Sequence, residues 1–294
     1  MQTLVLALLL GAVLTFFSDS WKDALRHGLV RYPAGVFAAP AVLTAAFCAS
    51  AELAGAASLP LAFAMAAYTT APALCVYRAG PGPAKHPGAG DFAAILLLWL
   101  PLEFALGAHL VPLPAQGFLH AAAYGVAILL ALVLFAGFRD FPGLKFNLPR
   151  GARDYAWPAI GLAAVAPVLA VTGIAIGFIP WPHAPAHPDP GWMAGRFLLI
   201  FAATGLPEEI LFRSLIQNLL MLRFGARTSV LLFAAVLFGC AHLNNGPQPL
   251  PNWRYAILAS IAGFAYGKVF DAAGTVLSSA ALHAAVDAIK HFFF

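Results

Sequence analysis

Long apolar segments recur along this chain, and they constrain its fold more than any other feature. The stretch 117–137 contains no charged residue, and 92–108 contains one, Glu103. A helix that crosses a bilayer needs about 20 mostly apolar residues. Charged residues make up only 10% of the chain, whereas a soluble domain has about 25%. The sequence therefore predicts an all-α fold, a polytopic bundle of transmembrane helices.

Length and hydropathy together predict about eight to ten membrane spans. The ten segments that meet the criterion are 2–18, 34–54, 58–77, 92–108, 117–137, 156–181, 192–222, 228–243, 254–270 and 273–293. The segment 192–222 is longer than a bilayer requires. Proline lacks the helical N–H donor and disfavours helix at the residue before it. We therefore expect one helix to end near Thr204 and a second to begin at Pro207.

Lysine and arginine residues concentrate in alternate loops. One set of loops holds twelve of them, at positions 22, 26, 31, 78, 85, 139, 145, 150, 153, 223, 227 and 268. The opposite set holds only Arg196, Arg254 and Lys290. Because basic loops stay in the cytoplasm, this alternation places both termini on the non-cytoplasmic side. The net charge of +4 then reflects basic cytoplasmic loops that face anionic membrane lipid, and we expect no nucleic-acid partner. Alanine-rich helices and short loops favour a bacterial cytoplasmic membrane.

Ionisable residues at membrane depth are costly and mark functional sites, and here they collect in the last third of the chain. In "GLPEEILFR", Glu209 and Arg213 are four residues apart and share a helix face, so they can form an ion pair. Glu208 is turned by about 100° from Glu209, which leaves its carboxylate for chemistry. His283 and Asp287 in "HAAVD" also share one helix face.

His242, in "FGCAH", completes a set of side chains that can activate water. A glutamate and a histidine can take the proton of a water molecule, and a second histidine can stabilise an oxyanion. Alternatively, Glu208, His242 and His283 can hold a divalent metal such as zinc, which lowers the pKa of bound water. Between the motifs, Gly263 and Gly267 have the GxxxG spacing that brings helix backbones close together.

These three motifs, EExxxR, FxxxH and HxxxD in that order, resemble the CPBP family. This is the group of CAAX-processing and bacteriocin-processing intramembrane proteases, also called Abi, and it includes the type II CAAX prenyl endopeptidase. The resemblance covers about 195–290. We therefore divide the chain into 1–190, transmembrane helices of unassigned role, and 191–294, a CPBP-like catalytic helical core.

The resemblance implies a role for each motif residue. Glu208 and His242 would activate the attacking water, and Glu209 and Arg213 would support them. His283 and Asp287 match the motif credited with stabilising the oxyanion, where the better-known members tend to carry Asn. An ionised aspartate cannot donate a hydrogen bond, so Asp287 would be protonated, orient His283 or bind a metal. Whether the family uses a metal is left open by the sequence, which lacks the HExxH zinc signature.

We expect an intramembrane endopeptidase that acts on a membrane-anchored or lipid-modified protein or peptide. One alternative is a catalytically silent immunity or scaffold protein of the same fold, although a scaffold has no reason to bear the cost of desolvating these groups. A proton-coupled transporter is the other. A transporter would predict a repeat between the two halves of the chain. Outside the last third of the chain, Glu103 is the main residue that favours a transporter, and we place it near the outer boundary of the membrane.

Overall fold

We describe the protein from a computed structural model, and the residues described are 1–185, 189–246 and 249–294. Every regular element in these ranges is a helix, which confirms the predicted all-α class. The chain forms two compact units, Met1–Gly143 and Leu144–Phe294, and we describe each by itself. The predicted division at 190 rests on the motifs and remains a prediction.

Fewer helices than the ten predicted are long and apolar enough to cross a membrane. Within the described ranges, four meet both conditions, and a pair of helices bent by 83°, Gln2–Thr15 and Asp19–Arg31, can form a fifth. The four are Pro33–Leu53, Leu59–Ala79, Leu113–Phe138 and Ala152–Ala175. The difference arises because several apolar segments fold into shorter pieces, such as the 13-residue helix Thr228–Cys240. The chain is thus a membrane protein with several spans, but the count of ten is not supported.

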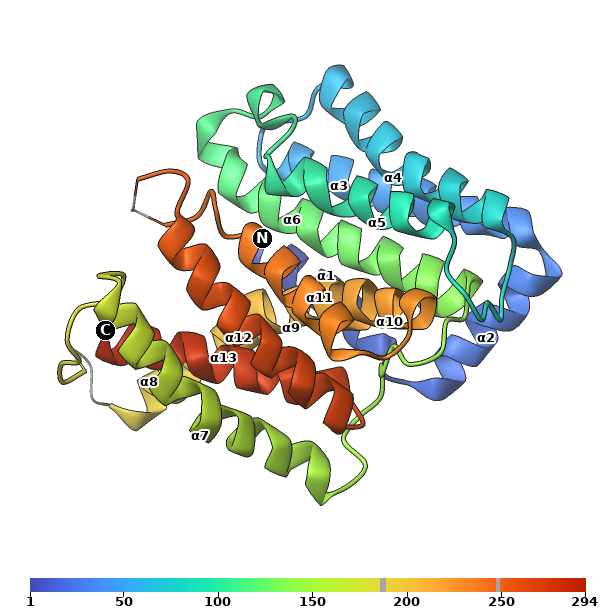
Figure 1. Ribbon diagram of the computed structural model, residues 1–294. Coiled ribbons are helices and arrows are strands. Elements are labelled where there is room, and N and C mark those ends of the chain that lie inside the picture. The colour runs from blue at the N-terminus through green and yellow to red at the C-terminus, as the bar shows by residue number, and fades with distance from the viewer. Residues whose placement is uncertain (186–188, 247–248) are drawn as a thin grey trace. The chain divides into compact units, whose positions relative to one another are not determined.

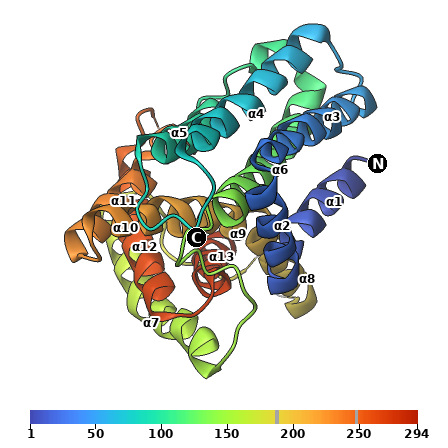
Figure 2. The same ribbon diagram turned by 90° about the vertical axis from the view of Figure 1, so that its right-hand side faces the viewer.

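The N-terminal unit is a bundle around one long central helix. Its helices are α1 (Gln2–Thr15), α2 (Asp19–Arg31), η1 (Pro33–Phe37), α3 (Ala38–Leu53), α4 (Leu59–Ala79), α5 (Ala89–Glu103), η2 (Ala108–Leu110), α6 (Leu113–Leu132) and η3 (Val133–Phe138). Figure 2 shows α3, α4, α5 and α6 running side by side. A buried bidentate pair between Arg139 and Asp91, at 2.8 and 3.1 Å, joins the end of η3 to the start of α5.

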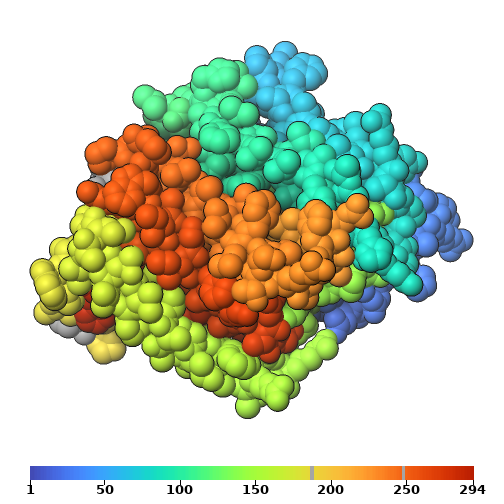
Figure 3. Space-filling model, in the orientation of Figure 1, coloured from blue at the N-terminus to red at the C-terminus, as the bar shows by residue number. Residues whose placement is uncertain are grey.

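The C-terminal unit contains all three motifs. Its helices are α7 (Ala152–Ala175), α8 (Pro190–Ile200), η4 (Phe201–Gly205), α9 (Leu206–Glu209), η5 (Ile210–Gln217), α10 (Asn218–Phe224), α11 (Thr228–Cys240), α12 (Trp253–Ala272) and α13 (Val276–Phe293). Helix α12 packs against α7, α11 and α13 (Figure 1). On the face shown in Figure 3, α7 lies directly beside α12. The core of this unit therefore lies around α12.

Glycines on facing sides of α11 and α12 allow these helices to pack closely. A Cβ atom on Gly239 would lie 2.4 Å from the carbonyl oxygen of Ala256, and one on Gly267 would lie 2.4 Å from Cδ1 of Leu231. Gly263 is similarly covered by the Phe238 ring, 2.8 Å from the position of an added Cβ. The close packing predicted from the GxxxG spacing is confirmed, and it brings Phe238 against α12.

The segment that carries the first motif does not break at Gly205. It is helical from Pro190 to Phe224, with π-helical turns at Phe201–Gly205 and Ile210–Gln217. The N–H of Leu206 donates to the carbonyl of Phe201, five residues back. A π turn re-spaces the carbonyls in front of Pro207, which has no N–H to offer and would clash with a regular α-helical carbonyl. The predicted break was therefore wrong, because the chain accommodates the proline by widening the helix.

Candidate active site

The two glutamates of the first motif lie on α9, which crosses close to α13. At the crossing, a Cβ atom on Gly205 would lie 3.0 Å from the carbonyl oxygen of Ala280 and 3.5 Å from Cβ of Ala284. Glycine is thus the residue that lets the two backbones come together. The contact places Glu208 and Glu209 beside His283, although 74 residues separate Glu209 from His283 along the chain.

Glu209 and Arg213 form the ion pair predicted from their spacing. Arg213 Nε donates to Glu209 Oε2 at 3.0 Å, and both side chains are fully buried. The guanidinium also lies over the rings of Phe238 and Tyr266, with its Cζ 4.8 and 5.9 Å from their centroids. Arginine suits this position because its planar, weakly hydrated charge stacks on aromatic faces. The pair is a rigid, charged support beneath the site.

Glu209 also holds His283. The Nδ1 atom of His283 lies 3.1 Å from Glu209 Oε1. Because Arg213 keeps Glu209 ionised, this carboxylate can only accept, so Nδ1 carries the proton. The other ring nitrogen, Nε2, lies 3.8 Å from Glu208 Oε2 and 3.6 Å from Asp287 Oδ2. Nε2 of His283 is thus the point toward which Glu208 and Asp287 converge.

His242 has the opposite kind of support, a backbone carbonyl. Its Nδ1 lies 2.9 Å from the carbonyl oxygen of Phe238, and since a carbonyl only accepts, Nδ1 is the donor. In the neutral ring, Nε2 then keeps a lone pair that can take a proton. The ring packs edge-on against Tyr255, with centroids 4.6 Å apart. Its orientation leaves one basic nitrogen available for chemistry.

The two histidines line one cavity. It measures about 320 Å³, and its polar lining comes from His242, His283, Asp287, Lys290 and the two tyrosines Tyr255 and Tyr266. The rest of the wall is apolar and includes Pro167 and Ala170 of α7. Glu208 and Glu209 are not among the lining residues. Glu208 approaches the site through Nε2 of His283, with a side chain that remains 29% exposed.

The three motifs therefore lie at one site, but Glu209 contacts both Arg213 and His283, whereas the spacing indicated only the contact with Arg213. The Phe238 ring contacts both imidazoles, with centroid distances of 4.8 Å to His242 and 5.7 Å to His283. Asp287 contacts His283, as the shared helix face predicted. His291, four residues after Asp287, contacts Arg196 and stacks on Trp192.

The candidate metal triad of Glu208, His242 and His283 does not fit a metal ion. Across the described ranges, no group of three His, Cys, Asp or Glu side chains is arranged to hold one. We therefore derive no catalytic step through a metal.

Three residues of the site escaped the sequence analysis. Tyr266 stacks on the ring of His283 at 4.6 Å, and Tyr255 packs on His242. Lys290 lies over the rings of Tyr255 and Phe178, with Nζ 4.5 and 4.8 Å from their centroids. Tyr266 lies inside the "GFAYG" motif, where only the glycines were interpreted. Lys290 is 35 residues from Tyr255 in the sequence, so no motif spacing indicates their contact.

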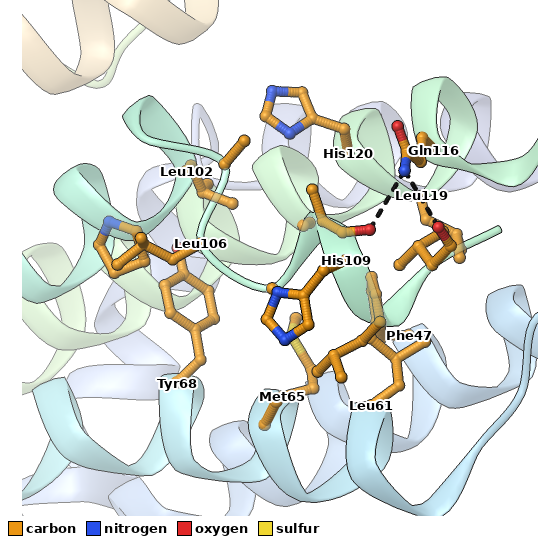
Figure 4. Close-up of a pocket in the computed structure, with 18 of the residues that line it drawn as sticks. Phe47, Leu61, Met65, Tyr68, Leu102, Leu106, His109, Gln116, Leu119 and His120 are labelled. Atoms are coloured by element: carbon orange, nitrogen blue, oxygen red, sulfur yellow. Dashed lines mark hydrogen bonds between the residues drawn. The ribbon is translucent and has the colours of Figure 1, made fainter. Parts of the chain in front are cut away.

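A larger cavity, of about 810 Å³, lies inside the N-terminal unit (Figure 4). Its wall is mostly aliphatic, and its polar members include His109, Gln116 and His120. The amide of Gln116 donates to the backbone carbonyls of Ala108 and Val111. No carboxylate lines this cavity. Glu103, at the end of α5, accepts from the indole of Trp99 at 3.0 Å.

Comparison with known proteins agrees with the motifs. Residues 190–289 match the family model described as type II CAAX prenyl endopeptidase Rce1-like, and this range contains the three motifs. No curated protein and no solved structure matches the chain. The expected resemblance to CPBP proteases is confirmed over this range, and the matched family is one of CAAX-type membrane proteases. Within the C-terminal unit, residues 190–289 are thus similar to the Rce1-like type II CAAX prenyl endopeptidase family.

Proposed function

We propose that this protein is an intramembrane endopeptidase in which Glu208 and His242 activate the water that cleaves the peptide bond. The observation that carries this proposal is the convergence of side chains from α9, α13 and the turn after α11. Glu208 lies 3.8 Å from Nε2 of His283, which lines the same cavity as His242. A gap of this size is within reach of one bridging water. Buried acids and imidazoles that share a cavity are characteristic of hydrolytic sites.

The supports of the two histidines suggest different roles for them. Because Nδ1 of His242 donates to Phe238 O, its Nε2 can accept a proton from the attacking water, together with the Glu208 carboxylate. The attack forms a bond from the water oxygen to the carbonyl carbon and leaves negative charge on the carbonyl oxygen. In its doubly protonated form, His283 presents Nε2–H to that oxygen. The proton taken from water is then passed to the leaving amine as the C–N bond breaks.

Asp287 fits an orienting role better than that of an oxyanion donor. Its Oδ2 lies 3.6 Å from Nε2 of His283, which favours the N–H form of that nitrogen. The Glu209 carboxylate, held by Arg213, fixes the ring from the other side. Glu209, Arg213 and Asp287 are therefore proposed as positioning residues, while Glu208, His242 and His283 act on the reactants.

The cavity walls support a membrane-anchored or lipid-modified substrate. The helix α7 contributes the apolar residues Ala166, Pro167, Leu169 and Ala170. An extended peptide segment can enter such a cavity when lipid or a lipid anchor holds it at the membrane. The partners proposed for this protein are therefore membrane lipid and a protein or peptide attached to it.

The test is cleavage of a membrane-anchored reporter peptide by the full chain in proteoliposomes. Replacing Glu208 or His242 with glutamine should lower kcat by a factor of about 10² to 10⁴, the range for general acid–base groups. The matched control is Glu52→Gln, which changes an exposed carboxylate in the N-terminal unit and should leave cleavage intact. Full activity in Glu208→Gln would refute the assigned base. Stable insertion without cleavage of any reporter would favour a scaffold, and proton flux across the vesicle would favour a transporter.

A further inference from the structure

Contacts inside the C-terminal unit define one end of it, which we call the basic end. Lys145 donates to backbone carbonyls at the end of α12, including those of Phe270 and Ala273. Asp154, at the start of α7, accepts from the backbone N–H of Gly274 at 2.6 Å. Gln217 donates to Asp271 at 2.9 Å. The segments 144–154, 217–231 and 267–278 therefore lie together.

A second group of contacts defines the opposite end, which we call the cavity end. The N–H of His183 donates to the carbonyl of Phe293 at 2.9 Å, and Arg196 Nε lies 3.3 Å from His291. Lys290 lies over the rings of Phe178 and Tyr255. The loop after α7, the start of α8, the start of α12 and the end of α13 thus meet there.

Lysine and arginine are unequally divided between the two ends. The basic end carries six of them, Lys145, Arg150, Arg153, Arg223, Arg227 and Lys268, while the cavity end carries Arg196, Arg254 and Lys290. Tryptophans mark the cavity end, where the side chains of Trp181 and Trp253 are 77% and 52% exposed. Exposed tryptophans are typical of the level of lipid headgroups, and excess basic residues are typical of the cytoplasmic side.

The active-site cavity belongs to the cavity end. Phe178, His242, Tyr255, Lys290 and Phe294 line it there, and none of its lining residues comes from the three segments of the basic end. Lys290 is exposed, so the cavity reaches the surface at this residue. Its deepest polar members, Tyr266 and His283, lie part of the way toward the basic end.

We propose that the active site is entered from the non-cytoplasmic face of the membrane. The substrate is then a membrane-anchored protein or peptide whose scissile bond lies on that face, within reach of the headgroup layer. This inference rests on the proposed peptidase function for its substrate, but its geometry does not depend on catalysis.

Labelling of single cysteines in intact cells tests the orientation. Cys48, Cys75 and Cys240 are first replaced with alanine, and one cysteine is returned at Trp181, Lys290 or Ala226. Ala226 is exposed at the basic end, and its replacement leaves the number of basic residues unchanged. A membrane-impermeant maleimide should label Trp181→Cys and Lys290→Cys at once, and Ala226→Cys only after permeabilisation. The reverse pattern would overturn the proposal.

A cleavage measurement in the same cells separates this proposal from the proposed function. A reporter with its cleavable segment on the non-cytoplasmic side should be cut, and its inverted counterpart should not. Cleavage by Lys290→Cys, measured first without label, should fall further when the impermeant maleimide is added, whereas the same reagent should spare Ala226→Cys. Cleavage of the inverted reporter alone would overturn the orientation while supporting the peptidase. If neither reporter is cut, the peptidase function fails and the labelling pattern still decides the orientation.

Discussion

Two adjacent glutamates offer a direct test of the site, because the structure gives them opposite environments. The side chain of Glu209 is fully buried and contacts both Arg213 and His283. The side chain of Glu208 is 29% exposed and contacts Nε2 of His283. The same change, glutamate to glutamine, can therefore be made one residue apart in the chain. Glu209→Gln should affect folding, and Glu208→Gln should affect chemistry.

The magnitude follows from what each change leaves behind. Glu209→Gln leaves the guanidinium of Arg213 buried without a counterion, and its two terminal nitrogens have no hydrogen-bond partner within the described structure. Breaking one partner of a buried ion pair costs about 3–5 kcal/mol. The stacking of Arg213 on Phe238 is present before and after the change, so it does not alter the difference. We therefore expect a loss of about 3–5 kcal/mol in the free energy of unfolding. For the partly exposed Glu208, the loss should stay below about 1 kcal/mol.

The assay is reversible unfolding in mixed micelles, followed by the loss of helical circular dichroism, with reporter cleavage measured in parallel. Glu208→Gln should be inactive and nearly as stable as the parent. A double variant, Glu209→Gln with Arg213→Met, should recover most of the lost stability, because an apolar replacement removes the unpaired charge. Equal stability of the two single variants would refute the assignment of Glu209 as the structural partner. If Glu209→Gln were inactive while Glu208→Gln kept its activity, the proposed roles of the two glutamates would be reversed.

Three further predictions concern other contacts. Gly205→Val should push α9 away from the Ala280 carbonyl, which lies 3.0 Å from an added Cβ, and should therefore reduce cleavage. Gly195→Ala, which has no atom within 4 Å of the added carbon, should leave cleavage unchanged. Equal activity of the two variants would contradict the close crossing of α9 and α13. Asp287→Asn should retain activity. Asp287→Ala should lower kcat about 10- to 100-fold with little change in KM, since losing a charged contact costs about 1.5–3 kcal/mol. A large loss of activity in Asp287→Asn would show that the charge itself is needed. Asp91→Asn should lower the unfolding free energy by about 3–5 kcal/mol because it leaves Arg139 buried without a charge partner, and a thermal melt within 1 °C of the parent would count against this pair.

Features set by neighbouring residues were predictable from the sequence. The Glu209–Arg213 pair and the contact between His283 and Asp287 both follow from a spacing of four on one helix. The close approach of α11 and α12 follows from Gly263 and Gly267. In each case the information lies within one or two helical turns, where backbone geometry fixes which side chains can meet.

Features that depend on long-range packing were not predictable. Nothing in the motifs indicated that Glu209, rather than Glu208, would bond Nδ1 of His283, because the crossing angle of α9 and α13 decides it. The contact of Lys290 with Tyr255 likewise joins two helix ends far apart in sequence. The span count failed for a related reason, since hydropathy does not report where an apolar segment bends or shortens. Nor can it distinguish an α turn from a π turn before Pro207.

The π turns between Phe201 and Gln217 carry a consequence for how this protein can change by insertion and deletion. Each such turn holds one residue more than an α turn would need. Deleting a single residue from Phe201–Gly205 would let the backbone tighten to a regular α turn, so α8 and the glutamates would keep their relative rotation. The widened turn in front of Pro207 would then be lost, and the proline ring would meet a regular α-helical carbonyl. Loss of one codon in this stretch would therefore leave every motif letter intact and destabilise the helix at the proline. Surviving homologues that lack this residue should also lack the proline.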